Sequence, residues 1–173
     1  MSPERSLSAV LTASLAVAAL ANEPTETAAP IVERADRVLV VKSERKLYLM
    51  KGNSALREFD VSLGLAPTGH KLRSGDSRTP EGTYYLDARN VDSNFFLSIH
   101  VSYPNDSDRR HAAALGVDPG GQIMIHGQPN QPRYSESRYQ GLDWTDGCIA
   151  VSNSDMVDIW LMTGEGTPIE IRP

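Results

Sequence analysis

A cysteine and a histidine are the residues of this sequence best suited to covalent chemistry. Cys148 is the only cysteine of the chain, and His126 ends an apolar run upstream of it. A cysteine nucleophile needs a histidine that accepts its proton, a group that orients the imidazole, and backbone N–H donors for the developing oxyanion. The carbonyl of Gly127 can accept the second imidazole N–H, and Gly147 allows a sharp turn in which several N–H groups converge. These residues predict nucleophilic catalysis by a thiol.

The three other histidines have neighbours that indicate solvated or structural positions. His70 lies in a loop rich in glycine and serine, His100 in an apolar strand, and His111 beside two arginines on a helix. We expect His70 and His111 to face solvent and His100 to be packed. No two histidines have metal-ligand spacing, and a structural zinc site would require more than one cysteine. No metal or other cofactor is expected.

The N-terminal residues have the pattern of a secretory signal. Arg5 precedes an apolar run over residues 7–21 that ends in Ala19-Leu20-Ala21, the small residues that signal peptidase recognises. This run is shorter than the ~20 apolar residues that span a bilayer, and no cysteine directly follows it for lipid attachment. We therefore expect a signal peptide over residues 1–21, cleavage after Ala21, and a periplasmic or otherwise exported protein without a transmembrane segment.

The rest of the chain is expected to form one domain. Residues 22–36 are interpreted as a short tether and residues 37–173 as a catalytic domain long enough for its own core. The net charge is −5 and Lys and Arg do not cluster, so nucleic-acid binding is not expected. Export also bears on Cys148, which without an intramolecular partner is an intermolecular bridge, a reactive thiol or an inert buried residue.

The elements that must position these residues are mainly strands. Alternation of apolar and polar residues predicts seven of them, in segments 38–41, 46–50, 56–63, 83–86, 94–104, 121–127 and 166–173. One helix is expected from a cap at Asn105 or Asp106 to Gly116, and a second after a cap at Ser152. Residues 128–146 are expected to form a loop. The predicted class is mostly β, a β-rich α+β fold with two short outer helices.

Three motifs carry a resemblance to a known family. The segments IMIHG (123–127) and TDGCIAV (145–151), with TPEG (79–82) upstream, resemble the YkuD-type L,D-transpeptidases of bacterial cell-wall metabolism. The resemblance extends from about Val38 to Ile171 and implies a YkuD-like mixed β-sandwich or barrel. The segments GCIAVSN, SYPND and GVDPGGQIMIHG are similar to the YafK-like subgroup, which includes hydrolases that detach peptides or proteins from peptidoglycan.

The resemblance implies a role for each residue of the motifs. Cys148 corresponds to the nucleophile, His126 to its base, and the Gly127 carbonyl to the group that orients the histidine. Thr145 corresponds to the Ser/Thr position beside the site. The oxyanion hole corresponds to three backbone N–H groups, those of Asp146, Gly147 and Cys148. Pairing with the histidine is expected to lower the thiol pKa to within roughly 3.5–7.5.

Two positions depart from the family pattern. Asp146 stands where the family usually has histidine, and Ala150 stands where it often has arginine or asparagine. Any substrate carboxylate held by that longer side chain must therefore be held by another group. For substrate binding the candidates are Arg78, Arg133 with Tyr134, Trp144 and Thr145. A surface arginine is usually only solvated, and packing explains Trp144 equally well.

The implied reaction is acyl transfer on peptidoglycan stem peptides. The thiolate attacks the carbonyl of the L-centre of meso-diaminopimelate, and an amine or water then resolves the thioester, which makes the enzyme a transpeptidase or a hydrolase. A protein attached to peptidoglycan is a further candidate substrate. A non-catalytic peptidoglycan-binding module is the alternative of another class, but such a module has no need of a free thiol. Sortases require an arginine soon after the cysteine, and NlpC/P60 peptidases place cysteine before histidine, so both fit less well.

Overall fold

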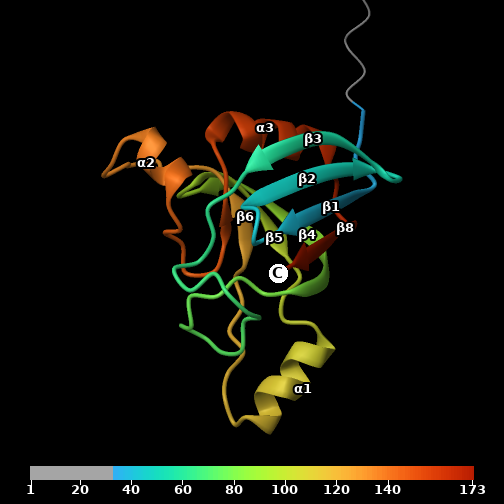
Figure 1. Ribbon diagram of the computed structural model, residues 1–173, viewed down its shortest axis with the longest axis vertical. Helices are drawn as coiled ribbons and strands as arrows, with labels where there is room; N and C mark the ends of the chain where they lie inside the picture. The colour runs from blue at the N-terminus through green and yellow to red at the C-terminus, as the bar shows by residue number, and fades with distance from the viewer. Residues whose placement is uncertain (1–32) are drawn as a thin grey trace, which may run out of the picture. The chain divides into compact units, whose positions relative to one another are not determined.

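The computed structural model describes residues 33–173 (Figure 1). The predicted signal peptide and most of the predicted tether lie outside the described residues. Within residues 33–173, no helix has both the length and the apolar character that a membrane crossing requires.

Eight strands form one mixed sheet in the order β3-β2-β1-β8-β4-β5-β6-β7 (Figure 1). The pairs β1–β8 and β6–β7 are parallel, and the other neighbours are antiparallel. The strands span β1 Arg37–Val41, β2 Lys46–Lys51, β3 Ser54–Asp60, β4 Gly82–Ser93, β5 Phe96–Val101, β6 Met124–His126, β7 Ile149–Ala150 and β8 Thr167–Arg172.

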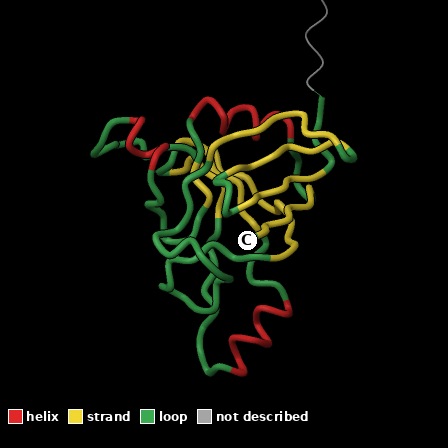
Figure 2. The backbone as a smooth tube through the Cα atoms, viewed as in Figure 1, coloured by secondary structure: helices red, strands yellow, loops and turns green. Residues whose placement is uncertain are grey.

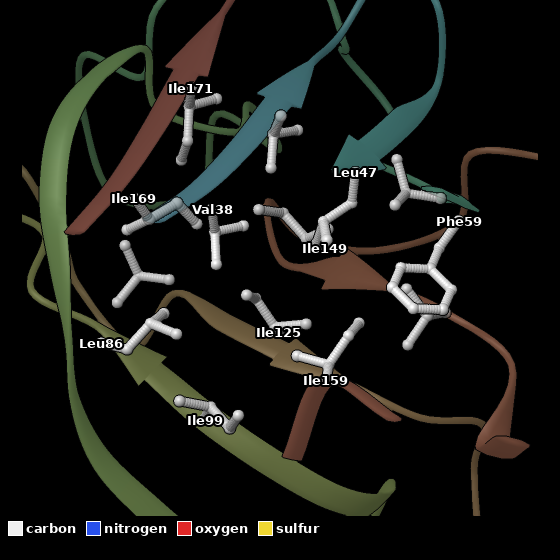
Figure 3. Packing of buried hydrophobic residues seen from close by; sticks show 14 of the residues in the cluster. Val38, Leu47, Phe59, Leu86, Ile99, Ile125, Ile149, Ile159, Ile169 and Ile171 are labelled. Atoms are coloured by element: carbon white, nitrogen blue, oxygen red, sulfur yellow. The ribbon is translucent and has the colours of Figure 1, made fainter. Parts of the chain in front are cut away.

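The alternation in the sequence explains how the sheet encloses its core. Val38 and Val40 of β1 are fully buried while their neighbours are only half-buried, and Leu47 and Leu49 of β2 follow the same pattern. Side chains from both halves of the sheet meet in one cluster (Figure 3) that includes Val38, Leu47, Leu86, Ile99, Ile125, Ile149, Ile159 and Ile169. A bridge between Ser62 and Ala150 joins the chain beyond β3 to β7, so the two edges of the sheet approach each other. The predicted β-rich sandwich or barrel is confirmed.

Three helices accompany the sheet, one more than predicted. α1 spans Asp106–Ala114, and the Asn105 side chain caps it in a capping box with Asp108. α3 spans Asn153–Met162, with the Ser152 side chain accepting from the N–H of Asp155. Figure 1 shows α3 lying along the sheet, where its buried face joins the core. The unpredicted α2, Glu136–Gly141, is short and has no side-chain cap, so the sequence carries little signal for it.

Four strand predictions are wrong in their bounds, and two of these strands, expected over 94–104 and 121–127, shorten to β5 and β6. The third strand ends at Asp60 instead of residue 63 because residues 61–65 leave β2 and pair with the segment around Cys148. β4 continues to Ser93 instead of ending at Leu86, and bulges interrupt its pairing with β5. The loops gather at one end of the sheet (Figure 2), where the N–H of Ser74 donates to the carbonyl of Asp118.

Candidate active site

His126 is the last residue of β6 and is buried. Its Nδ1 lies 2.7 Å from the carbonyl oxygen of Gly127. Because a carbonyl only accepts, Nδ1 carries the proton and Nε2 is left as the basic nitrogen. Gly127 permits this geometry, since a Cβ there would lie 2.5 Å from Oδ1 of Asn153.

Cys148 lies beside His126 because of the parallel pairing of β6 with β7. Ile125 pairs with Ile149 and His126 with Ala150, so Cys148 lies beside Met124 and is the diagonal neighbour of His126 on the same face of the sheet. Cys148 is a half-buried free thiol, and its Sγ donates to the carbonyl of Gln122 at 3.5 Å. Cysteine and histidine both line one cavity of about 380 Å³, called the thiol cavity below, together with Phe95, Gln122, Met124 and Trp144.

The hydroxyl of Thr145 organises the turn that carries the thiol. Its Oγ1 donates to the carbonyl of Cys148 at 2.8 Å and accepts from the N–H of Gly147 at 3.1 Å. The N–H of Gly147 is thus engaged inside the turn, which differs from its predicted place in an oxyanion hole. The N–H groups of Asp146 and Cys148 remain as candidates for that task.

A second loop supports the turn from behind. Gly147 has φ +123°, and a Cβ there would lie 2.5 Å from the carbonyl oxygen of Arg78. The chain beyond β3 adds further support, since the carbonyl of Leu63 accepts from the N–H groups of Trp144 and Thr145. The position of the thiol therefore depends on segments far from it in sequence.

The loop around Arg78 is itself held by a buried ion pair. Asp76 accepts from Nζ of Lys71 at 2.8 Å and from the backbone N–H groups of Leu72, Arg73 and Arg78. Burial opposes ionisation of Asp76, but these hydrogen bonds outweigh it and lower the pKa to about 2. The carboxylate stays charged at neutral pH and fixes the loop against Gly147.

Three of the predicted substrate-binding residues lie outside the thiol cavity. Arg78 directs its guanidinium to the carbonyl of His70, and its contribution near the site is the backbone carbonyl. Arg133 and Tyr134 are exposed in the segment before α2, where Tyr134 stacks with Arg138 instead. These residues are polar or aromatic for reasons of solvation and local packing.

Trp144 and Thr145 do line the cavity. The indole of Trp144 meets the imidazole of His126 edge-on, with ring centroids 5.6 Å apart, and its Nε1 donates to the carbonyl of Tyr139. Phe95 covers the imidazole from another side at 4.6 Å. The sequence analysis missed Phe95 and the polar residues of the same β4–β5 hairpin that reach the cavity, Asn90, Asp92, Ser93 and Asn94. The pairing of β5 with β6 brings these residues to the site, and no local pattern in the sequence indicates it.

The other three histidines lie outside the thiol cavity. His70 accepts from the N–H of Glu81 and lies 3.3 Å from Asp108, so the prediction that it is solvated is wrong. The loop folds back on α1, which a local pattern does not reveal. His111 is exposed as expected, and His100 contacts Asp87. Among residues 33–173, His, Cys, Asp and Glu form no group of three that could hold a metal ion.

Comparisons with known proteins agree with the motifs. Residues 35–171 match the L,D-transpeptidase catalytic domain model, YkuD. The chain belongs to this family. It is 31% identical over 96 residues to YafK of Escherichia coli (strain K12), a protein named as an L,D-transpeptidase, with 52% of this chain and 37% of YafK covered. The chain thus covers little more than a third of that relative's length.

Solved structures share the fold. The helical cell shape determining protein Pgp2 from Campylobacter jejuni superposes with a TM-score of 0.60 at 25% identity, covering 78% of this chain and 46% of Pgp2. The L,D-transpeptidase of Xylanimonas cellulosilytica (residues 123–326) gives a TM-score of 0.53 at 17% identity, covering 82% of this chain and 62% of that chain. The predicted resemblance to the YkuD family is confirmed.

The electrostatics of the site differ from the expected ion pair. Burial is the largest cause that raises the pKa of the Cys148 thiol, and the Asp146 carboxylate raises it further. The backbone N–H of Met124 and the Lys71 ammonium act in the opposite direction. Burial also lowers the pKa of His126, against the hydrogen bond to Gly127. The expected lowering of the thiol pKa is therefore wrong for the free protein. Both shifts favour the uncharged forms, a thiol beside an imidazole.

Alkylation of Cys148 by iodoacetamide is expected to be slow at pH 6. The rate follows the thiolate fraction, so it should rise about tenfold per pH unit up to at least about pH 8.5. Intact mass measured over a series of pH values gives this profile, with unfolded protein as the reference for an unperturbed thiol. A rate that is already constant from pH 6 upward would contradict the neutral pair and indicate a thiolate held by His126.

Proposed function

We propose that this protein is an exported cysteine acyltransferase that acts on peptidoglycan stem peptides through a thioester on Cys148. The observation that carries the proposal is the orientation of His126. Its Nδ1–H is fixed on the Gly127 carbonyl, so Nε2 is the nitrogen available to a thiol that lines the same cavity. Membership of the L,D-transpeptidase family supports the substrate class.

The first half-reaction forms the thioester. Nε2 of His126 takes the thiol proton as Sγ of Cys148 bonds to the carbonyl carbon at the L-centre of meso-diaminopimelate. The carbonyl oxygen becomes an oxyanion, which the N–H groups of Asp146 and Cys148 stabilise. The C–N bond then breaks, and the imidazolium gives its proton to the leaving amine. Because the thiol begins neutral, proton transfer accompanies the attack.

The second half-reaction releases the acyl group. An amine of another stem peptide, or water, attacks the thioester while Nε2 of His126 accepts its proton, and the sulfur leaves and regains a proton. A cross-link forms in the first case and a free carboxylate in the second. Exposed polar residues at the cavity, Asn90, Asp92, Asn94 and Asp146, favour the hydrolase as the second candidate because they leave the thioester accessible to water.

Two further parts of the proposal concern location and substrate size. Export rests on the signal-like pattern of residues 1–21. A protein attached to peptidoglycan would be cleaved by the same chemistry, with its linking amine as the leaving group. A module that only binds peptidoglycan would not need the oriented histidine beside a free thiol, so this alternative is less well supported.

Intact-protein mass spectrometry with purified disaccharide-tetrapeptide tests the proposal. We expect a transient mass increase equal to the disaccharide-tripeptide acyl group on the thiol, with loss of the terminal D-amino acid. The muropeptide products decide the second step, since cross-linked dimers indicate a transpeptidase and tripeptide alone indicates a hydrolase. No adduct and no product, with either this substrate or peptidoglycan carrying a linked protein, would contradict the proposed function.

A further inference from the structure

A second hollow continues the thiol cavity across the outer face of the sheet. Strand register places Asn90, Ser98 and His126 in one row across β4, β5 and β6, and Ala88, His100 and Met124 in the next row. His100 and His126 are therefore diagonal neighbours on the same face of adjacent antiparallel strands, at a separation of about 7–8 Å.

The hollow is large enough for a polar group of a substrate. It measures about 320 Å³ and includes Ala88 and His100, and we call it the His100 hollow. Four residues, Asn90, Ser98, Gln122 and Met124, line both this hollow and the thiol cavity. A peptide whose scissile carbonyl lies at Cys148 can thus extend into the hollow without leaving the surface.

A β-bulge orients the imidazole of His100. The pairing of β4 with β5 shifts register between Leu86 and Ala88, which places Asp87 opposite no residue of β5. The carboxylate of Asp87 lies 2.6 Å from Nδ1 of His100. A carboxylate accepts, so Nδ1 carries a proton and the ring is held with Nε2 directed away from this partner. As an imidazolium, His100 can donate through Nε2 to a second acceptor.

Charged residues are distributed unevenly along the continuous surface. Asp92 and Asp146 line the thiol cavity, whereas Arg89 and His100 line the His100 hollow, with the Asp87 carboxylate beside His100. The Arg89 guanidinium is engaged elsewhere, since it lies over the Trp160 ring at 4.5 Å and donates to the carbonyls of Trp160 and Thr163. His100 is left as the basic residue of the His100 hollow that a substrate can reach.

The position that often carries a longer polar side chain in the family cannot serve here. Ala150 is buried, and its backbone is paired with Ser62. A carboxylate of the substrate would be repelled by Asp92 and Asp146, whereas in the His100 hollow it can accept a hydrogen bond from Nε2 when the imidazole is protonated.

We infer that the His100 hollow binds a free carboxylate of the stem peptide, with His100 as its ligand and Asp87 as the residue that positions the imidazole. This inference rests on the proposed function, whose substrate it specifies. The bond is charge-assisted, so its loss should weaken productive binding by roughly tenfold or more. The carboxylate does not take part in the chemistry, so loss of this hydrogen bond should raise KM and leave kcat similar.

Matched substrates test the inference. Disaccharide-tetrapeptide with all carboxylates free is compared with two versions, one amidated at D-isoglutamate and one at the D-centre of diaminopimelate. For the unaltered full chain, we expect one amidated version to show a KM about tenfold higher with similar kcat. His100→Gln should raise KM for the free acid to the same degree and abolish the preference, and His100→Arg should restore it. Asp87→Asn should weaken the preference for the free acid.

His111→Gln is the matched control, because His111 is an exposed histidine on α1 that lines neither hollow. It should leave KM unchanged. Turnover with the same KM for free and amidated substrates, or a preference that survives in His100→Gln, would overturn the inference and leave the proposed function standing. No turnover of any substrate by the unaltered protein would overturn both. If His100→Gln fails to fold, the His100→Arg and Asp87→Asn variants test the inference in its place.

Discussion

Replacement of Cys148 by alanine is expected to abolish thioester formation and lower turnover on the order of 10⁶-fold, as deletion of the nucleophile does in other acyl-transfer enzymes. The reason is chemical, because His126 without the thiol has no nucleophile to activate. The measurement pairs intact mass after exposure to disaccharide-tetrapeptide with the rate of product release. Cys148→Ser should also lack the adduct, since a hydroxyl is a weaker nucleophile than a thiol in this setting.

The fold should survive the same substitution. The thiol is half-buried and makes one side-chain hydrogen bond, a long one to the Gln122 carbonyl. Loss of one small sulfur atom should therefore change the free energy of unfolding by about 1 kcal/mol or less. Circular dichroism during urea unfolding checks this. A Cys148→Ala protein that folds and retains full turnover would exclude the thioester mechanism.

The parts of the fold that the sequence predicts are those set by local patterns. Alternation of apolar and polar residues predicts the early strands, because every second side chain of a strand points to the same face. The side chains buried in this way are those of Val38, Val40, Leu47 and Leu49. The cap of α1 was predicted because an asparagine before a short helix satisfies free N–H groups. Each of these signals lies within a few residues of the structure that it specifies.

The parts that the sequence does not predict depend on contacts between distant segments. Residues 61–65 leave the third strand in order to support the turn at Thr145, and Arg78 contributes a carbonyl where a side chain was expected. The β4–β5 hairpin brings Phe95 over the imidazole only because β5 pairs with β6. Composition does not encode such pairings, so the lining of the cavity had to come from the structure.

The protonation state of the thiol illustrates the same limit. From the sequence, a cysteine near a histidine predicts a stabilised thiolate. In the structure, burial acts on both groups and favours the neutral form of each. The identity of the pair was predictable from the motifs, but its charge depends on how deeply the fold buries it.

Gly147→Ala is expected to displace the thiol although it changes no reacting group. Its φ of +123° disfavours a side chain, and the new Cβ would lie 2.5 Å from the Arg78 carbonyl. Strain and overlap should cost about 2–4 kcal/mol of stability if the turn keeps its position. If the turn moves instead, the shift should lower kcat by roughly 10²-fold or more.

Gly141→Ala is the matched control, since a Cβ at Gly141 meets nothing within 4 Å and its φ is not in the left-handed region. Urea unfolding and the rate of adduct formation should be measured for both variants. Gly141→Ala should match the unaltered protein both in urea unfolding and in the rate of adduct formation. A Gly147→Ala protein with unchanged stability and unchanged adduct formation would contradict the support of the turn by Arg78. If Gly147→Ala loses stability and adduct formation while Gly141→Ala keeps both, the reactivity of the thiol depends on distant backbone as well as on the Cys148–His126 pair.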